Sequence, residues 1–376
     1  MTAPAAGRAV LFVSVPTGVG GSTRSLANLL SYLRGDATRI LAGPGRGRFV
    51  GLVADLGGAD EYLRVISSRW PRPVRRAWSA MRVAWYARRH RGRLAAIHAN
   101  GLKELSLALP AALLSRVPLV VWVHNFLLPP SVRLLGGVWR RLLPRCDVRW
   151  AAVSPLARDL VVDAGLTAAS RVEVVPNPID PADLLTSREA SPPGSPVTVA
   201  FLGSPRPYKG FHLLPDIIDA VGLDPPVRWL IFSHQTDDEV AATWDRLRQL
   251  DATGHVSIEG KFTDVRTAYA RCDVVVCPSL YDSFCRVAAE AMLNGIPVAG
   301  SDLEPIRDLL GDDEAGLLFP RGDVPAAAKA VTRLVSDADL RARLGAAGRE
   351  RATAFAPDTV RRQMLALYGL APRSTS

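Results

Sequence analysis

Residues 277–300, CPSLYDSFCRVAAEAMLNGIPVAG, decide the fold that we expect for this chain of 376 residues. The apolar run at 274–277 predicts a buried strand, which ends where Pro278 removes a backbone donor. A polar loop follows, and residues 286–293 have the spacing of a helix that stops at Gly295. The residues PVAGS predict the next strand. This order of strand, loop, helix and strand indicates an open α/β sheet, in which ligands bind at the carboxyl ends of the strands.

Two carboxylates lie in this stretch, Asp282 in the loop and Glu290 in the predicted helix. With free backbone N–H groups at the helix start, they could hold hydroxyl groups and a phosphate together. The segment resembles the signature of the retaining glycosyltransferases of family four, E-x-F-G-x-x-x-x-E-A-M followed by G-x-P-V. Glu290 and the residues at 295–298 match it. Asp282 replaces the first Glu, which shortens the reach by one methylene, and Cys285 replaces the Gly.

The resemblance implies the GT-B fold, an α/β architecture of two Rossmann-like domains whose parallel sheets face each other across a cleft that holds the active site. The length of the chain and its hydrophobic content of 48% suit two domains of about 180 residues each. The clearest linker is SREASPPGSP at 187–196, which is rich in Ser and Pro. We therefore expect an acceptor-side domain at 1–186 and a nucleotide-sugar-binding domain at 197–355. A last helix within 356–372 is expected to cross back to the first domain.

A glycine-rich turn follows the apolar run at 9–15 and precedes a helix predicted at 26–33. It contains Gly18, Gly20 and Gly21, and glycines between a strand and a helix let the backbone approach a ligand closely. A tight structural turn is the alternative. The resemblance favours the functional interpretation, because the family has a comparable loop that faces the nucleotide-sugar phosphates and the acceptor.

Two buried strands predicted at 94–100 and 118–126 carry a histidine toward their ends, His98 and His124. A single histidine at a strand end is usually structural. The resemblance, however, implies that His124 contacts the donor sugar, while the role of His98 stays open. The family element P-N-G-V-D corresponds to PNPID at 176–180.

A second loop, SPRPYKGFHLL at 204–214, resembles the family loop G-R-x-x-x-x-K-G, whose Arg and Lys neutralise the donor diphosphate. Lys209 and the glycine after it match. Ser204 stands where the family has Arg, and Arg206 follows two residues later. Either Arg206 takes over that role, or the site has one cation fewer.

The resemblance implies transfer of a hexose from a nucleotide diphosphate sugar to a hydroxyl of a lipid-linked, glycan or small-molecule acceptor, with the anomeric configuration retained. No cofactor and no metal are expected, since basic residues would neutralise the diphosphate. The implied catalytic residues are His124, Arg206, Lys209 and Asp282. The implied donor-binding residues are Gly20, Gly21, Lys209, Ser283, Phe284, Cys285 and Glu290, the last of which would bind the ribose. Two alternatives remain: a nucleotide-sugar epimerase of the same fold, and an inactive relative that binds lipid or nucleic acid.

Charge is unevenly distributed along the chain. Residues 1–182 contain 25 Lys and Arg against 10 Asp and Glu, whereas the whole chain has a net charge of +10. The excess indicates an anionic partner of the N-terminal half. The sequence contains no motif that resembles a DNA-recognition helix or a base-stacking sheet, so we do not expect a nucleic-acid partner.

The four cysteines have no metal-binding spacing, and no leader precedes the first strand. Together these features predict a cytoplasmic protein with reduced thiols.

Residues 62–103 contain no acidic residue. Within them, Val74, Trp78, Met81 and Trp85 recur at helical spacing, with arginines between them. One interpretation is a helix that lies peripherally on an anionic membrane, on the inner face, with its Trp side chains among the headgroups. The other is a docked helix whose apolar stripe belongs to the core and whose arginines are merely solvated.

Overall fold

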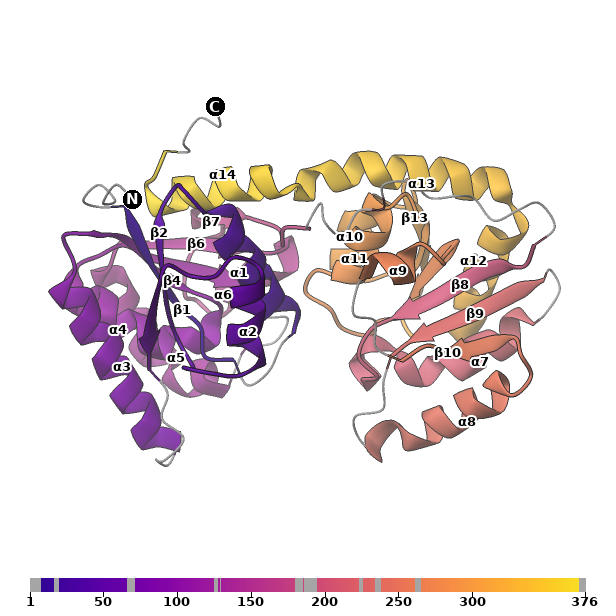
Figure 1. The fold of residues 1–376 in the computed structure, drawn as a ribbon, viewed down its shortest axis with the longest axis horizontal. Coiled ribbons are helices and arrows are strands. Elements are labelled where there is room, and N and C mark those ends of the chain that lie inside the picture. Colours follow the sequence, from indigo (N-terminus) through magenta and orange to yellow (C-terminus); the bar gives the residue numbers. More distant parts are fainter. Residues whose placement is uncertain are drawn as a thin grey trace. The chain divides into compact units, whose positions relative to one another are not determined.

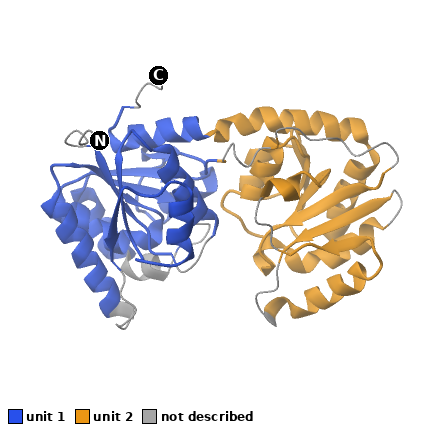
Figure 2. Cartoon of the chain, in the orientation of Figure 1, with its two compact units in different colours: residues 1–178, 357–376 blue, residues 179–356 orange. Residues whose placement is uncertain are grey.

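The computed structural model describes residues 8–16, 20–65, 72–124, 128, 130–179, 185, 195–222, 226–233, 238–260 and 265–371. The chain forms two compact units (Figure 2): unit 1 is Met1–Pro178 with Pro357–Ser376, and unit 2 is Ile179–Ala356. Each unit contains one sheet of parallel strands, which confirms the predicted α/β class. Gly18 and most of the linker predicted at 187–196 lie outside the described residues.

Unit 1 contains a seven-stranded sheet with the order β3-β2-β1-β4-β5-β6-β7, in which every pairing is parallel (Figure 1). The strands are β1 Ala9–Val13, β2 Thr38–Gly43, β3 Glu61–Arg64, β4 Leu94–Ala99, β5 Leu119–Val123, β6 Val148–Ala152 and β7 Val172–Val174. The helices are α1 Gly21–Tyr32, α2 Arg48–Asp55, α3 Arg72–Arg89, α4 Leu105–Ser115, α5 Pro130–Leu142, α6 Pro155–Asp163 and α14 Pro357–Tyr368. Short 3-10 turns occur at η1 Leu102–Glu104, η2 Leu143–Arg145 and η3 Ala169–Arg171.

The central strands of this sheet are buried on both faces. Every residue of β1 and of β5 is buried, as expected for apolar runs covered by helices on both sides. The strand order reverses between β1 and β4, and this is the topological switch point of unit 1. The loop after β1 therefore opens at the edge where a doubly wound sheet binds ligands.

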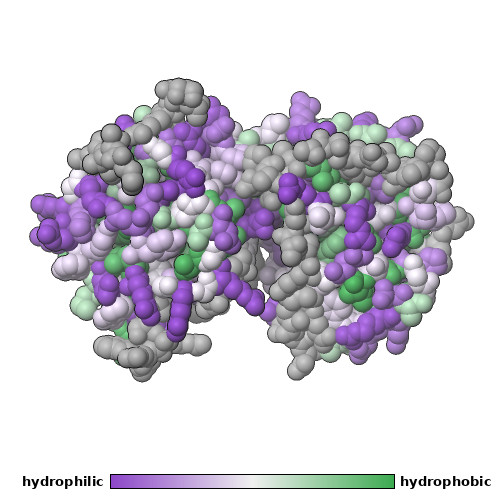
Figure 3. Space-filling view, viewed as in Figure 1, coloured by the Kyte–Doolittle hydropathy of each residue, from purple (hydrophilic) through white to green (hydrophobic). Residues whose placement is uncertain are grey.

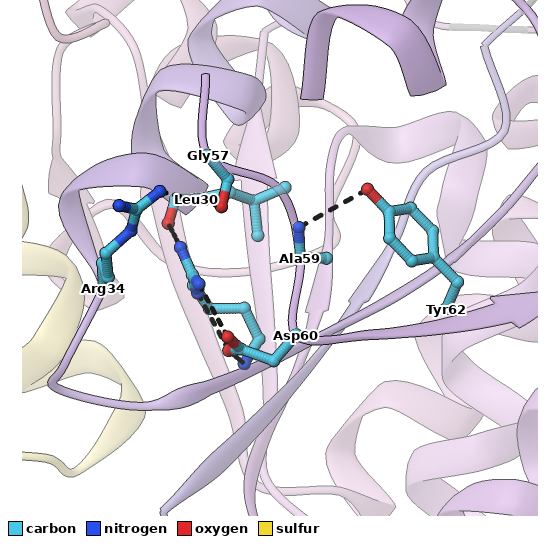
Figure 4. Close-up of polar contacts among 7 residues, drawn as sticks. Leu30, Arg34, Gly57, Ala59, Asp60 and Tyr62 are labelled. Atoms are coloured by element: carbon cyan, nitrogen blue, oxygen red, sulfur yellow. Dashed lines mark hydrogen bonds and ion pairs between the residues drawn. The ribbon is translucent and has the colours of Figure 1, made fainter. Parts of the chain in front are cut away.

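An ion pair between buried Arg39 and half-exposed Asp60 lies at the edge of this sheet (Figure 4). The Arg39 guanidinium donates two hydrogen bonds to the Asp60 carboxylate, at 3.0 and 2.7 Å, and one to the Leu30 carbonyl at 2.8 Å. Burial alone would raise the pKa of Asp60, but the hydrogen bonds from Arg39 lower it below its usual value. Beside this pair, Arg34 donates to the Gly57 carbonyl at 3.0 Å. These contacts connect α1, β2 and the turn before β3.

The last helix, α14, packs on α1 in unit 1, although the whole of unit 2 separates the two in sequence (Figure 1). Arg361 forms a bidentate ion pair with Asp36. Its Nε and Nη2 lie 2.7 and 2.8 Å from the two Asp36 carboxylate oxygens, and the Asp36 carboxylate is almost fully buried. Arg149 also donates to the Leu367 carbonyl at 2.7 Å. Tyr368 is buried in the core of unit 1.

Unit 2 contains a six-stranded parallel sheet with the order β10-β9-β8-β11-β12-β13. The strands are β8 Val197–Leu202, β9 Val227–Phe232, β10 Val256–Ile258, β11 Val274–Cys277, β12 Val298–Ser301 and β13 Gly316–Phe319. The helices are α7 Leu214–Val221, α8 Ala241–Asp251, α9 Val265–Tyr269, α10 Arg286–Leu293, α11 Glu304–Leu310, α12 Val324–Ser336 and α13 Ala338–Ala352. Its 3-10 turns are η5 Pro207–Lys209, η6 Phe211–Leu213, η7 Asp238–Val240 and η8 Thr353–Phe355.

The switch point of unit 2 lies between β8 and β11, where the strand order reverses. The loop that carries Lys209 follows β8, and the loop that carries Asp282 follows β11. Because both strands end at the same edge, the topology brings together two loops that are about seventy residues apart in sequence. In the described part of the chain, no helix has the length and apolar character needed to cross a bilayer.

Candidate functional site

The two loops at the switch point of unit 2 are bound to each other through their backbones. The Tyr208 carbonyl accepts hydrogen bonds from the Leu280 and Tyr281 N–H groups, at 2.8 and 3.1 Å. Gly210 has a left-handed backbone, with φ of +70°, and a Cβ there would lie 1.8 Å from the Pro278 carbonyl oxygen. Only glycine fits this approach, which explains why a glycine follows Lys209.

The centre of this site is an ion pair between Lys209 and Asp282. The Lys209 Nζ lies 2.6 Å from Asp282 Oδ2, and the exposed fractions of the two side chains are 26% and 11%. Burial would lower the pKa of Lys209, but the Asp282 carboxylate raises it above its usual value, so that the ammonium stays charged. Burial would likewise raise the pKa of Asp282, but Lys209 holds that pKa below its usual range. Both groups are therefore ionised at neutral pH.

Asp282 also accepts hydrogen bonds from its own loop. Its Oδ1 lies 2.8 Å from the Ser283 N–H nitrogen and 3.4 Å from that of Phe284, and a backbone hydrogen bond from Cys285 helps to lower its pKa. These are the backbone donors that the sequence predicted for a sugar or phosphate. The shorter carboxylate folds back on them. Phe284 itself is buried and packs edge to face on Phe355, with ring centroids 5.5 Å apart.

Cys285 occupies a backbone conformation that normally belongs to glycine. Its φ of 53° and ψ of 67° are left-handed, and it is the N-cap residue directly before α10. This is the position where the family signature has Gly, so the substitution keeps the conformation but introduces strain. The buried thiol lies within hydrogen-bonding reach of Cys277, and that contact together with burial raises the pKa of Cys277. All four cysteines are free thiols.

Glu290 lies one and a half turns further along α10, and its carboxylate is oriented by two neighbours. Oε2 accepts from the Tyr269 hydroxyl at 3.0 Å, and Oε1 accepts from Arg286 Nε at 3.0 Å and lies 2.8 Å from Arg286 Nη2. Only 9% of the Glu290 side chain is exposed. A carboxylate has about four lone-pair directions, so these contacts leave acceptor capacity for a ligand. The sequence analysis missed Tyr269 and Arg286, although Arg286 is four residues before Glu290 in the helix.

Arg206 and Lys209 belong to the same turn. Arg206 precedes η5, and its carbonyl accepts a hydrogen bond from the Lys209 N–H at 2.9 Å. Ser204, at the position where the family has Arg, is exposed, whereas Arg206 is half-buried. Arg206 is thus the candidate for a second cation in this loop, and its role there stays a prediction.

In unit 1, Gly20 and Gly21 form the start of α1. Gly20 is the residue before the helix, and its N–H donates to the Thr23 hydroxyl at 2.7 Å. The sequence predicted that the helix begins at residue 26, but it begins at Gly21. A Cβ at either glycine would meet no atom of the described residues within 4 Å, so these residues leave open space beside the helix N-terminus.

His124 follows β5 directly, at the same carboxyl edge of the sheet. Its ring lies 4.4 Å from that of Trp122, and both ring nitrogens are buried without a well-formed hydrogen bond to the described residues. Burial lowers the pKa of His124 to about 3, and the Asn177 side chain partly opposes this shift. The imidazole is therefore neutral at physiological pH. Asn177, in the PNPID element, is buried next to it.

His98 is a core residue. It is fully buried, its Nδ1 lies 2.9 Å from the Tyr368 hydroxyl, and its ring packs against Phe12 and Trp122. Burial lowers its pKa to about 3, and the neighbouring His124 adds to the shift. The structural interpretation therefore holds for His98, which connects β4 to the last helix.

Glu104 is a buried carboxyl that the sequence analysis missed. It is 6% exposed, and its Oε1 is 3.5 Å from the Val15 N–H nitrogen, in the loop that leads to Gly20. Burial raises the pKa of Glu104 to about 7. The sequence contains a feature that could have identified Glu104, since it is the single acidic residue between Glu61 and Asp147.

Comparison with known families supports the sequence resemblance. The family model of glycosyl transferases group 1 matches residues 186–351, and that of glycosyltransferase family 4 matches residues 19–183. A phosphatidyl-myo-inositol mannosyltransferase of Mycobacterium leprae is 30% identical over 278 residues, 72% of this chain and 72% of that protein. The lipopolysaccharide core biosynthesis glycosyltransferase LpsE of Rhizobium meliloti is 31% identical over 194 residues, 51% of this chain and 52% of that protein.

Solved structures with the same fold cover almost the whole chain. Anabaena HepE, crystallised in complex with UDP and glucose, has a TM-score of 0.80 at 21% identity, over 96% of this chain and 99% of that one. A glycosyltransferase from Rickettsia africae has a TM-score of 0.79 at 15% identity, over 96% and 98% of the two chains. At such low identity these likenesses bear on the fold alone, and they agree with two Rossmann-like domains.

Proposed function

This chain belongs to the group 1 and family 4 glycosyltransferases with the GT-B fold, and on that premise we propose that it transfers a hexose from a nucleotide diphosphate sugar to a hydroxyl group, with retention of the anomeric configuration. The observation that carries this proposal is the Lys209–Asp282 pair between the loops of β8 and β11. It places a charged ammonium at the switch point of a doubly wound sheet, where nucleotides bind.

The role proposed for this loop is to stabilise the departing diphosphate. Bond cleavage to the sugar leaves negative charge on the leaving phosphate, and a preorganised cation lowers the barrier where that charge develops. Lys209 stays protonated beside Asp282, and Arg206 in the same turn is the second cation. The diphosphate would compete with Asp282 for Lys209, and the released carboxylate would then accept hydrogen bonds from the sugar hydroxyls. With two cations available, we propose a reaction without a metal.

The role proposed for Glu290 is to accept hydrogen bonds from the ribose hydroxyls. Tyr269 and Arg286 fix the orientation of its carboxylate without using all of its acceptor directions. They are positioning residues, because they act through Glu290. Ser283, Phe284 and Cys285 would offer their backbone N–H groups to the donor once Asp282 turns away from them.

In unit 1, we propose that neutral His124 contacts the transferred sugar and that the Gly20–Gly21 turn receives phosphate or acceptor oxygens. The open space beside both glycines supports the second role. The names of the M. leprae and R. meliloti relatives refer to a phosphatidylinositol and a lipopolysaccharide core, which supports a lipid-linked acceptor. Such an acceptor would place the enzyme at the inner face of the membrane.

The test is a transfer assay with UDP- and GDP-hexoses, first screened by their effect on thermal unfolding. A transferase releases nucleoside diphosphate only as fast as a glycosylated acceptor forms, and the product keeps the anomeric configuration of the donor. EDTA should leave the rate unchanged. An epimerase would instead release nucleoside diphosphate and free sugar without acceptor, and an inactive relative would bind no nucleotide sugar. Either result would reject the proposal.

A further inference from the structure

The helix α3 packs on unit 1 with one face and exposes the opposite one. Ser79, Val83, Ala84 and Ala87 are buried, and Ser79 donates to the Val65 carbonyl. At 100° per residue these positions form one face of the helix. The helix lies along α4, and Figure 1 shows the two side by side at the edge of unit 1.

The apolar stripe that the sequence identified does not lie on this packed face. Val74 is 43% exposed, Met81 63% and Trp85 67%, and Trp78 is half-buried. These four side chains point away from the core, along one line of the helix. This excludes the interpretation in which the stripe belongs to the core of unit 1. Large apolar side chains at such exposure, gathered in a row, mark an interaction site.

Arginines flank the stripe on one side. Arg75, Arg82 and Arg89 follow each other at seven-residue intervals, so they form a parallel row, and the Arg82 guanidinium lies 4.7 Å from the centre of the Trp78 ring. None of the three makes an ion pair with the residues that the structure describes. On the face drawn in Figure 3, the region over α3 shows hydrophilic residues with hydrophobic ones between them. We call these seven residues, Val74, Arg75, Trp78, Met81, Arg82, Trp85 and Arg89, the α3 surface.

Two other arginines fasten α3 to its neighbour. Arg76 donates to the Lys103 carbonyl at 2.9 Å and to the Ser106 hydroxyl at 2.8 Å, and Arg88 donates to the Leu114 carbonyl at 3.0 Å. They lie near the two ends of α3 and reach the two ends of α4. The α3 surface is therefore presented by a helix that is fixed along its length.

We propose that the α3 surface docks unit 1 on an anionic lipid bilayer. Trp and Met side chains in a row suit the headgroup and upper acyl region, where an amphipathic ring has one apolar and one hydrated end. The row of arginines complements anionic headgroups, and residues 62 to 103 contain no acidic residue. This goes beyond the proposed reaction, because adsorption to a bilayer needs no turnover.

The position of α3 in unit 1 relates membrane docking to the binding of a lipid-linked acceptor. The helix follows β3, so its first turns lie at the carboxyl edge of the parallel sheet, the edge that also carries Gly20 and His124. Val74 and Trp78 are therefore at the end of α3 that is closer to this edge. A bilayer held there would bring the headgroup of a lipid-linked acceptor toward unit 1.

The experiment is co-sedimentation of the full chain with phosphatidylglycerol–phosphatidylcholine vesicles and with phosphatidylcholine vesicles alone. We expect binding to the anionic vesicles only, and loss of binding at about 0.5 M NaCl, where screening is strong. The double substitution Arg82→Ser with Arg89→Ser should weaken binding about 20- to 30-fold, since one basic residue near an anionic surface contributes about fivefold. Met81→Ser with Trp85→Ser should weaken it at least about tenfold. Brominated lipids should quench Trp fluorescence, and less so after Trp85→Phe.

Matched variants control for charge and for folding. Arg333→Ser with Arg343→Ser removes the same two charges from exposed sites in unit 2, and Met81→Leu with Trp85→Phe keeps the stripe apolar. Both should bind as the wild type does. Equal binding to neutral vesicles, or equal losses from the α3 and unit 2 arginine variants, would overturn the proposal. So would binding to RNA or to a protein in place of vesicles. Nucleotide-sugar binding, measured on the same preparations, should not change, so failure here leaves the proposed reaction untouched.

Discussion

At the scale of single residues, Cys285 shows how the chain departs from its family signature without losing the local structure. Its left-handed backbone suits glycine, and a side chain there costs about 1 kcal/mol. We predict that Cys285→Gly is more stable than Cys285→Ala by about 1 kcal/mol in urea unfolding, the reverse of the usual order. At Cys277, in the extended strand β11, the Ala variant should be the more stable one. If the Gly and Ala variants have the same order of stability at both positions, the backbone at Cys285 is not strained.

Glu290 is the residue whose carboxylate we assign to the ribose. Glu290→Gln should lower kcat/KM for the donor at least about tenfold, because a charge-assisted hydrogen bond contributes about 1.5–3 kcal/mol. The substitution should also lower the free energy of unfolding, since it leaves the largely buried Arg286 without its carboxylate partner. The control is Glu314→Gln, at an exposed site of unit 2. Kinetics like those of the wild type would take Glu290 out of the site.

Glu104 makes stability depend on pH in a defined direction. Its folded pKa is raised from 4.5 to about 7 by burial, so between these values the folded chain holds a proton that the unfolded chain has lost. The free energy of unfolding should therefore fall as pH rises through this window, by up to about 3 kcal/mol from this one group.

The substitution Glu104→Gln isolates this contribution. Its stability relative to the wild type should rise between pH 5 and pH 8, as measured by urea unfolding at both values. The buried histidines titrate equally in both proteins and cancel in the difference. Glu350→Gln, at an exposed site, should show no such trend. A constant difference between Glu104→Gln and the wild type would show that the carboxyl is already ionised at pH 5.

At the scale of elements, α14 is the clearest case of a segment fixed by contacts far apart in sequence. Asp36 and Arg361 form its main polar anchor, and 1% of the Asp36 side chain is exposed. Removing one partner of a buried pair leaves an unpaired charge, which costs about 3–5 kcal/mol. Arg361→Ala should lower the melting temperature of unit 1 clearly, whereas Arg362→Ala, one residue further and exposed, should not. If the two variants melt alike, the pair is not what holds α14.

Several elements could be predicted from the sequence because their patterns are strong. The helix predicted at 286–293 has those bounds in the structure, and the apolar runs predicted at 9–15 and 118–126 contain the strands Ala9–Val13 and Leu119–Val123. The edge strand Glu61–Arg64 was missed, because half of its residues face solvent and four residues are too few for a clear alternation. The N-terminus of α1 was placed five residues late, because Gly21 and Ser22 have low helix propensity.

The contacts of the site were harder to predict than its residues. Lys209 and Asp282 were identified separately by resemblance, but their ion pair depends on the strand order of the sheet, which no local pattern contains. The same holds for the hydrogen bond between Tyr368 and His98, two residues that are 270 positions apart in sequence. The sequence also did not decide which face of α3 packs on unit 1. Small residues such as Ser79 and Ala87 make that contact, and the aromatic stripe does not.

At the scale of the whole molecule, charge and chemistry are divided between the two units. The N-terminal half carries most of the positive charge and presents the α3 surface, whereas unit 2 concentrates the groups proposed to hold the donor. The division fits an enzyme that meets an anionic interface with one unit and a nucleotide sugar with the other. The donor diphosphate on Lys209 is the central claim of this account.

The most direct test is isothermal titration of UDP and GDP into the wild type, Lys209→Ala and Lys329→Ala, the last at an exposed site of unit 2. The account predicts that one nucleoside diphosphate binds the wild type and Lys329→Ala equally. Lys209→Ala should bind it at least about tenfold more weakly, since it loses a charge-assisted contact and leaves Asp282 uncompensated. Adding Asp282→Asn should restore part of the loss. Equal affinity of Lys209→Ala and the wild type, or no binding of either nucleotide to the wild type, would contradict the account.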